Sequence, residues 1–104
     1  MYINLNILQV INYNWNDNMD DNTLKIFAYI NISTYRIKAI KAMKTGNETP
    51  TQIANDSGIR LSHISKVLKE LKDCGVAECI NEKDRRNRIY KLTDLGQEIA
   101  DNLD

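Results

Sequence analysis

Residues 49–74 read TPTQIANDSGIRLSHISKVLKELKDC, and this stretch decides the fold. Thr49 and Pro50 are typical of a helix start, because a hydroxyl can cap the free backbone N–H groups and Pro suits the first helical position. Gly58 then favours a tight turn. After the turn, Ser62 is expected to cap a second helix. Two short helices joined by a glycine turn predict a helix-turn-helix.

The second of these helices, expected over about 62–74, has the clearest amphipathic pattern in the chain. Its apolar residues follow the i, i+3, i+4, i+7 spacing of one helix face: Ile64, Val67, Leu68 and Leu71. Small and basic side chains gather on the opposite side: Ser62, Ser65, Lys66, Lys69 and Lys72. We therefore expect one face in the core and one basic face in solvent.

The sequence after Gly75 predicts a β-hairpin with a long charged tip. Apolar-rich runs at 76–80 and 88–93 flank a polar gap that is longer than a tight turn. The tip holds four basic residues: Lys83, Arg85, Arg86 and Arg88. Thr93 and Asp94 are expected to begin a last short helix.

Two further helices are expected before residue 49. Acidic and capping residues at 20–22 precede apolar residues at 24–30, a pattern that favours a short helix. Ser33 can cap the next helix, over about 35–44, until Gly46 stops it. We interpret this second helix as a core helix with a solvated basic side.

Residues 1–18 differ from the rest, with six Asn and one charged side chain, Asp17. One interpretation is an upstream extension, with translation starting at Met19. The other is an arm that packs on a partner subunit. Residues 19–104 have the composition of one compact domain.

The charges are segregated along the chain although the net charge is zero. All 14 basic residues but seven of the 14 acidic residues lie within 22–91, so this segment has a net charge of +7. A basic middle suggests an anionic partner, with a solvated mixed-charge surface as the alternative. No stretch approaches the roughly 20 apolar residues of a membrane helix, and the N-terminus lacks the basic start of a secretory signal, so we expect a cytoplasmic protein.

The sequence favours neither an enzyme nor a metal site. One histidine, His63, and two cysteines, Cys74 and Cys79, are too few ligands unless acids or a second subunit supply others. We interpret both thiols as small apolar groups at a helix-to-strand corner, with redox sensing as the alternative. No catalytic pattern or phosphate-binding loop is present, and no cofactor is expected.

The order of these parts resembles a winged helix-turn-helix. The spacing of Ala54, Gly58, Ile64 and Val67 resembles the helix-turn-helix pattern, in which a small residue permits close packing and glycine makes the turn. Residues 82–96, EKDRRNRIYKLTDLG, resemble the wing of MarR-type regulators, with an Asp, then arginines, an apolar strand and a Leu-Thr-x-x-Gly ending. Together with 49–54 and 62–71, this segment is also similar to small archaeal winged-helix regulators. The resemblance covers about 32–100.

The resemblance implies a mainly α fold with a small β-hairpin wing over 19–104. It also implies a dimeric, sequence-specific transcriptional regulator that binds double-stranded DNA. The third helix of the winged helix, about 62–74, would enter the major groove, and the wing, about 81–88, would reach the backbone or the minor groove. MarR-type proteins usually have longer terminal helices that build the dimer and a ligand pocket, so no effector is assigned. Apolar residues offered for dimerisation are Leu24, Phe27, Ile30, Leu95, Ile99 and Leu103.

The residue chemistry supports the same DNA-binding site. Hydroxyl groups lie near two helix starts, where free N–H groups attract phosphate: Thr49, Thr51, Ser62 and Ser65. Side chains in the first turns of the third helix suit base contacts: His63, Ser65 and Lys66. Others suit phosphate: Arg60, Lys69, Lys72, and in the wing Lys83, Arg85, Arg86 and Arg88. Because phosphate repels carboxylate, Asp84 is expected to orient a neighbouring arginine.

Two other functions remain open from the sequence. One is a protein-interaction winged helix or complex subunit that does not read DNA, because fold does not fix function. The basic third helix argues against it. The other is RNA binding, against which the lack of stacking aromatics in the basic region weighs.

Overall fold

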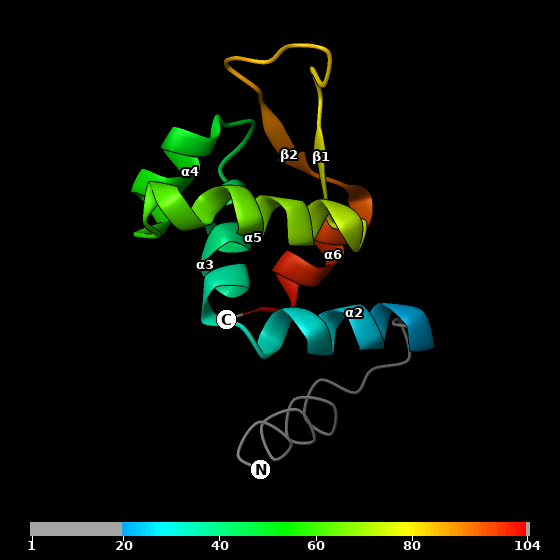
Figure 1. Ribbon diagram of the computed structural model, residues 1–104. Coiled ribbons are helices and arrows are strands. Elements are labelled where there is room, and N and C mark those ends of the chain that lie inside the picture. Colours follow the sequence, from blue (N-terminus) through cyan, green and yellow to red (C-terminus); the bar gives the residue numbers. More distant parts are fainter. Residues whose placement is uncertain (1–19, 104) are drawn as a thin grey trace.

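A computed structural model describes residues 20–103, and the expectations for residues 1–18 lie outside this part of the chain. The described chain forms five helices and one antiparallel hairpin (Figure 1). The elements are α2 Asp21–Asn31, α3 Thr34–Met43, α4 Pro50–Ser57, α5 Leu61–Asp73, β1 Ala77–Cys79, β2 Tyr90–Leu92 and α6 Asp94–Asp101. The expected mainly α fold with a β-hairpin is therefore confirmed.

Most helix starts are where local side-chain chemistry placed them. Asp20 accepts a hydrogen bond from Thr23 N at 2.7 Å, and Ser33 caps α3 through Arg36 N at 3.3 Å. Thr49 and Gln52 form a reciprocal capping box at the start of α4. These bonds satisfy backbone N–H groups that a helix start leaves without an intrahelical partner.

The start of α5 differs from the prediction, because Ser62 does not cap it. The cap residue is Arg60, which has extended backbone angles and makes no side-chain capping bond. Gly58, with a φ of 76°, makes the turn at the end of α4. The next residue, Ile59, is already buried, and its N–H donates to Ser57 Oγ at 3.2 Å, so the turn ends before Ser62 is reached. The helix therefore begins at Leu61, and Ser62 lies inside its first turn.

The core forms where α3, α4 and α5 pack together, with α2 and α6 closing it. Figure 1 shows α5 between α2 at one end of the molecule and the hairpin at the other. The four residues expected on the apolar face of α5 are all buried: Ile64, Val67, Leu68 and Leu71. Three further helices each place large side chains among them, Phe27 and Ile30 from α2, Ile40 from α3 and Ile99 from α6.

Arg36 departs from the expected solvated basic side of α3. Its guanidinium group lies 3.7 Å from the ring centroid of Tyr29 and donates to Tyr29 O at 2.9 Å. Its Nε also donates to Glu70 Oε1 at 3.3 Å, and its side chain is 13% exposed. Arg36 therefore links α2, α3 and α5.

The hairpin is attached to the helices at two places. On one side, Glu48 and Tyr90 form an isolated antiparallel bridge. Glu48 N donates to Tyr90 O at 3.1 Å, and Tyr90 N donates to Glu48 O at 2.8 Å. On the other, Thr93 caps α6 and its hydroxyl donates to Gly75 O at 2.6 Å. The wing is thus fixed to the segment before α4 and to the corner after α5.

Candidate nucleic-acid interface

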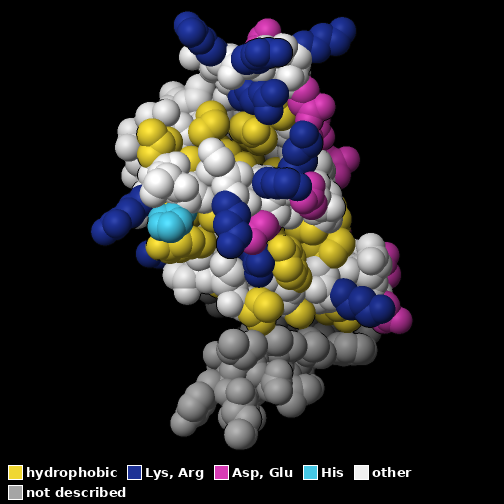
Figure 2. Space-filling view, viewed as in Figure 1, with side chains coloured by type: hydrophobic (Ala, Val, Ile, Leu, Met, Phe, Trp, Pro, Cys, Tyr) yellow, Lys and Arg dark blue, Asp and Glu magenta, His cyan; other side chains and the backbone are white. Residues whose placement is uncertain are grey.

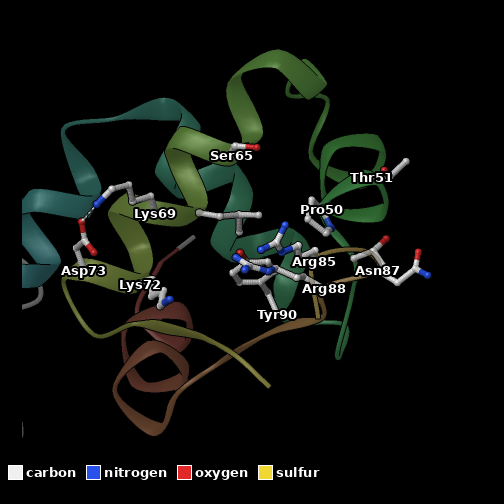
Figure 3. Close-up of a pocket in the computed structure, with 12 residues that line it drawn as sticks. Pro50, Thr51, Ser65, Lys69, Lys72, Asp73, Arg85, Asn87, Arg88 and Tyr90 are labelled. Carbon is white, nitrogen blue, oxygen red and sulfur yellow. Dashed lines mark hydrogen bonds and ion pairs between the residues drawn. The ribbon is translucent and has the colours of Figure 1, made fainter. Parts of the chain in front are cut away.

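A groove of about 800 Å³ lies between the start of α4, one side of α5 and the wing (Figure 3). Its lining residues are Thr49, Pro50, Thr51, Ser65, Leu68, Lys69, Lys72, Asp73, Arg85, Asn87, Arg88 and Tyr90. Four of the twelve are lysines or arginines, against one acid. Hydroxyl groups and the N-terminus of α4 add donors to the same walls. The groove therefore offers positive charge and hydrogen-bond donors to an extended anion.

The lysines of the groove are already paired with neighbouring carboxylates. Lys69 Nζ lies 2.9 Å from Asp73 Oδ2, one turn further along α5 (Figure 3). Lys72 forms an ion pair with Glu82 in the wing. The hydrogen bond with Glu82 raises the pKa of Lys72, and the same bond lowers the pKa of Glu82. These pairs hold the cations at the groove and are solvent-exposed, so an incoming phosphate can compete for them.

The wing loop is organised by Asn81 and Arg88. Asn81 Oδ1 accepts from Ile89 N at 2.7 Å, and its Nδ2 donates to Asn87 O at 3.0 Å. Arg88 Nε donates to Asp84 O at 2.8 Å, and its Nη2 donates to Glu82 O at 3.3 Å. Two of the donor groups of Arg88 therefore shape the loop.

The Asp84 carboxylate was expected to orient a neighbouring arginine, and within the described part of the chain it does not bind one. The nearby arginine binds its backbone oxygen, whereas Asp84 Oδ2 accepts from Asn81 Nδ2 at 3.2 Å. The loop curls so that Arg88 donates to the main-chain carbonyl groups of Glu82 and Asp84 instead of the Asp84 carboxylate. Asn87 completes this curl with a φ of 56°, a left-handed conformation that Asn tolerates better than most residues.

The structure brings seven of the thirteen sequence-predicted site residues together in the groove: Thr49, Thr51, Ser65, Lys69, Lys72, Arg85 and Arg88. The remaining six lie outside it. Arg60 and Ser62 are exposed at the start of α5, and Arg86 is exposed at the wing tip. Lys83 lies on the outer side of the wing, in a depression with Ile80 and Glu82.

His63 and Lys66 lie on the opposite side of α5 from the groove. They line a smaller depression of about 270 Å³ together with Tyr35 and Arg36 of α3. The rings of His63 and Tyr35 are 5.7 Å apart between centroids. The exposed surface of α5 therefore has two flanks, a groove side with Ser65 and Lys69 and an α3 side with His63 and Lys66.

Several residues of the groove were not expected from the sequence. Tyr90 and Asn87 reach it from the wing, and Asp73 limits the charge of Lys69. Tyr90 looked like an ordinary strand residue, and what places it here is its pairing with Glu48, 42 residues earlier. Lys72 was expected to bind phosphate, and it does line the groove.

Glu48, next to the groove, has an unusual carboxyl group. Its Oε1 is buried and has no hydrogen-bond donor among the described residues. Burial, and then the hydrogen bond with Asp56 and the negative charge of Asp56, raise the pKa of Glu48 to about 7. The Glu48 carboxyl group is therefore about half protonated at neutral pH.

The space-filling view shows where the charges gather (Figure 2). Lysines and arginines cover the wing at the top of the view and continue across the middle, over α5. Acidic side chains lie mostly along one edge of the same face. The basic surface is thus continuous from the wing to α5, as expected for contact with a polyanion.

Two helices joined by a tight turn, followed by a hairpin beside the second helix, define a winged helix-turn-helix protein. The family profile described as sugar-specific transcriptional regulator TrmB matches residues 28–95. The chain belongs to this family, which covers more than half of it.

A solved structure supports the same fold. The chain is similar to a MarR family transcription regulator, with a TM-score of 0.55 and 23% sequence identity. The match covers 76% of this chain and 58% of that one, so this chain spans little more than half the length of the solved protein. No curated protein matched the sequence. The expected resemblance to winged-helix regulators is confirmed.

Two further properties concern residues 20–103 alone. Within this range, no helix has the length and apolar character needed to cross a membrane. The same residues contain no group of three or more His, Cys, Asp or Glu side chains arranged to hold a metal ion. Cys74 and Cys79 are free thiols, each half-buried.

Proposed function

We propose that this chain is a sequence-specific transcriptional regulator that binds duplex DNA with α5 in the major groove and the wing on the adjacent backbone or minor groove. Membership of a transcriptional-regulator family and the winged-helix fold support a DNA-binding regulator. The insertion of α5, the contact residues, the cytoplasmic location and the homodimer are our own proposals. The family's description names sugar-specific regulators, and we assign neither a sugar nor any other effector to this chain.

One observation carries the proposal: the cationic groove between α5 and the wing. A strand of duplex backbone runs beside the major groove, so a helix in that groove and a wing outside it straddle one line of phosphates. The groove places Lys69, Lys72 and Arg85 on its two sides. At the start of α4 most N–H groups are used by the capping box, so Thr51, which lines the groove, is the residue assigned to the same line of phosphates.

The proposed contacts divide into two groups. Exposed residues of α5 are assigned to base edges: His63, Ser65 and Lys66. Residues at the helix starts, around the groove and along the wing are assigned to backbone: Thr49, Thr51, Arg60, Ser62, Lys69, Lys72, Lys83, Arg85, Arg86 and Arg88. Of the wing arginines, Arg86 is the most informative, because it is exposed and takes no part in the hydrogen bonds between described residues that shape the loop, in contrast to Arg88.

Binding of the purified chain to labelled duplexes tests the proposal. Duplexes enriched from a random-sequence library are compared with unrelated duplexes at several salt concentrations. Replacing Arg86 with Ala is expected to weaken binding to both and to lower the salt slope by about one, because a phosphate contact is lost. Replacing Ser65 or Lys66 with Ala is expected to reduce the preference for the enriched duplex by about 1 to 3 kcal/mol.

The opposite pattern would reverse the assignment of helix and wing. If Arg86→Ala changed only sequence preference while the α5 variants acted uniformly, the wing would read bases. If the chain bound no duplex at low salt, the DNA-binding function would be wrong and the protein-interaction alternative would replace it.

A further inference from the structure

Leu61 is a large apolar side chain left exposed at the start of α5. It is 58% exposed, the highest value among the large apolar side chains of residues 20–103. The core positions of α5 are occupied by others, so folding does not use Leu61. Binding to a partner that covers this side chain would remove its apolar surface from water.

Leu61 lies in line with residues that face the groove. Ser65 follows it by four positions and Lys72 by eleven, and at 3.6 residues per turn the three positions share one side of α5. Ser65 and Lys72 both line the groove (Figure 3). Leu61 therefore extends this side of the helix by one turn, at the end proposed to enter the major groove first.

The chemistry of the major groove supplies one apolar partner for such a side chain. In unmodified DNA, the C5 methyl group of thymine is the apolar feature among the donors and acceptors of the base edges. Its two neighbours in sequence, Arg60 and Ser62, are exposed and polar, and the positive charge of Arg60 favours a polyanion as the partner of this segment.

We propose that Leu61 contacts the C5 methyl group of a thymine and makes one base pair of each half-site specific for it. This inference rests on the proposed function, because it requires α5 in the major groove. It adds an apolar, specificity-determining contact to the polar ones assigned to Ser65 and Lys66.

Removal of single methyl groups from DNA tests the contact. Duplexes are enriched on the full chain from a random-sequence library, and each thymine of the enriched sequence is replaced by deoxyuridine, which lacks the C5 methyl. For the unmodified chain, replacement at one position per half-site is expected to raise Kd about threefold to fivefold, as for the loss of one buried methyl group. In Leu61→Ala the same replacement is expected to leave Kd unchanged, because the contact is already gone.

Ile80→Ala provides the matched control, because Ile80 is also a large exposed apolar side chain, on the wing and away from α5. This variant is expected to keep the deoxyuridine penalty. Melting temperatures confirm that both variants fold. The inference is wrong if no thymine position is sensitive in the unmodified chain, or if Leu61→Ala retains the full penalty. If no duplex is enriched at all, the proposed function fails and this contact with it.

Discussion

The two lysines of the groove, Lys69 and Lys72, are paired with carboxylates before any ligand arrives. Lys72 binds Glu82, and this carboxylate is held ionised because the pair lowers its pKa. Removing the Glu82 carboxylate leaves the ammonium group of Lys72 available to bind a phosphate group of DNA. We expect Glu82→Gln to increase affinity for random duplex DNA about threefold to tenfold at low salt, through one more phosphate contact.

The control for this change is Glu78→Gln, because Glu78 is an exposed acid on β1 and its loss changes the net charge equally. Titrations of both variants against random duplex, at several salt concentrations, give the comparison. Equal gains for the two variants would show a general charge effect and contradict a specific role of the Lys72–Glu82 pair.

Glu48 gives the domain a pH-dependent stability. Its pKa is about 7 in the folded chain against 4.5 as the ordinary value, so between these pH values the folded state binds more protons than the unfolded state. Stability from this group is therefore fully present below pH 4.5 and is lost as pH rises through 7. Glu48→Gln mimics the protonated form, and its melting temperature is expected to exceed that of the unmodified chain by roughly 5 °C at pH 8 and to match it near pH 5. Thermal unfolding at both pH values measures this, and a difference independent of pH would contradict it.

At the scale of elements, the junction between the hairpin and α6 depends on a glycine. A Cβ atom at Gly96 would collide with the backbone carbonyl of Val76, which belongs to the corner after α5. Alanine normally stabilises a helix relative to glycine by about 1 kcal/mol. Here we expect Gly96→Ala to destabilise the domain by about 1 to 3 kcal/mol, as in other overpacked sites. Urea unfolding decides the sign, and a stabilised variant would contradict the close approach.

The Leu-Thr-x-x-Gly ending of the wing has a structural explanation at the same junction. Thr93 Oγ1 accepts from Gly96 N at 3.1 Å and donates to Gly75 O, so one hydroxyl both starts α6 and ties it to the end of α5. Gly96 permits the contact with Val76. The sequence pattern that marked the wing therefore encodes the attachment of the wing to the rest of the domain.

Elements with local causes could be predicted from the sequence. The caps Ser33, Thr49 and Thr93 each accept from the N–H group three residues later, and Gly58 supplies the left-handed turn between α4 and α5. The start of α5 was misplaced, because Ser62 has the right chemistry but the helix is already formed at that position. The cap residue is Arg60 instead, and its side chain makes no capping hydrogen bond.

Features that join distant parts of the chain could not be predicted. The partners Arg36 and Glu70 are 34 residues apart, and Glu48 meets Tyr90 across most of the domain. A single sequence specifies the residue types but not these pairings. For this reason only seven of the thirteen predicted site residues meet in the groove, while His63 and Lys66 lie on the other flank of α5.

At the scale of the whole molecule, the expected dimer surface needs correction. Four of the six apolar residues offered for it are in the core of the single chain: Leu24, Phe27, Ile30 and Ile99. They are buried because α2 and α6 close the core. Leu95 and Leu103 are half-buried against it. The proposed homodimer therefore cannot use Leu24, Phe27, Ile30 or Ile99 without opening the core, whereas Leu95 and Leu103 keep part of their surface accessible.

We still propose two copies on one DNA site, because a single helix the length of α5 reaches few base pairs. The Cα atoms extend over 42 × 25 × 21 Å, and the two shorter dimensions are less than the roughly 34 Å between half-sites one turn apart. We expect an enriched duplex with two-fold symmetry and two chains bound to it. Sedimentation of the complex gives the stoichiometry, and one chain on an asymmetric site would contradict the proposal.

The Glu48–Tyr90 bridge has a mechanical consequence. It joins the wing strand to the residue before α4, the turn at Gly58 joins α4 to α5, and the Lys72–Glu82 pair joins α5 back to the wing. The strand bridge and the turn thus hold the wing and α5 at a set width on either side of α4, while the solvent-exposed Lys72–Glu82 pair on the third side yields when a phosphate competes for Lys72. A duplex whose backbone spacing differs from that width must bend or twist to fit, so the strain of a poor match falls on the DNA and its flexibility becomes part of what is selected.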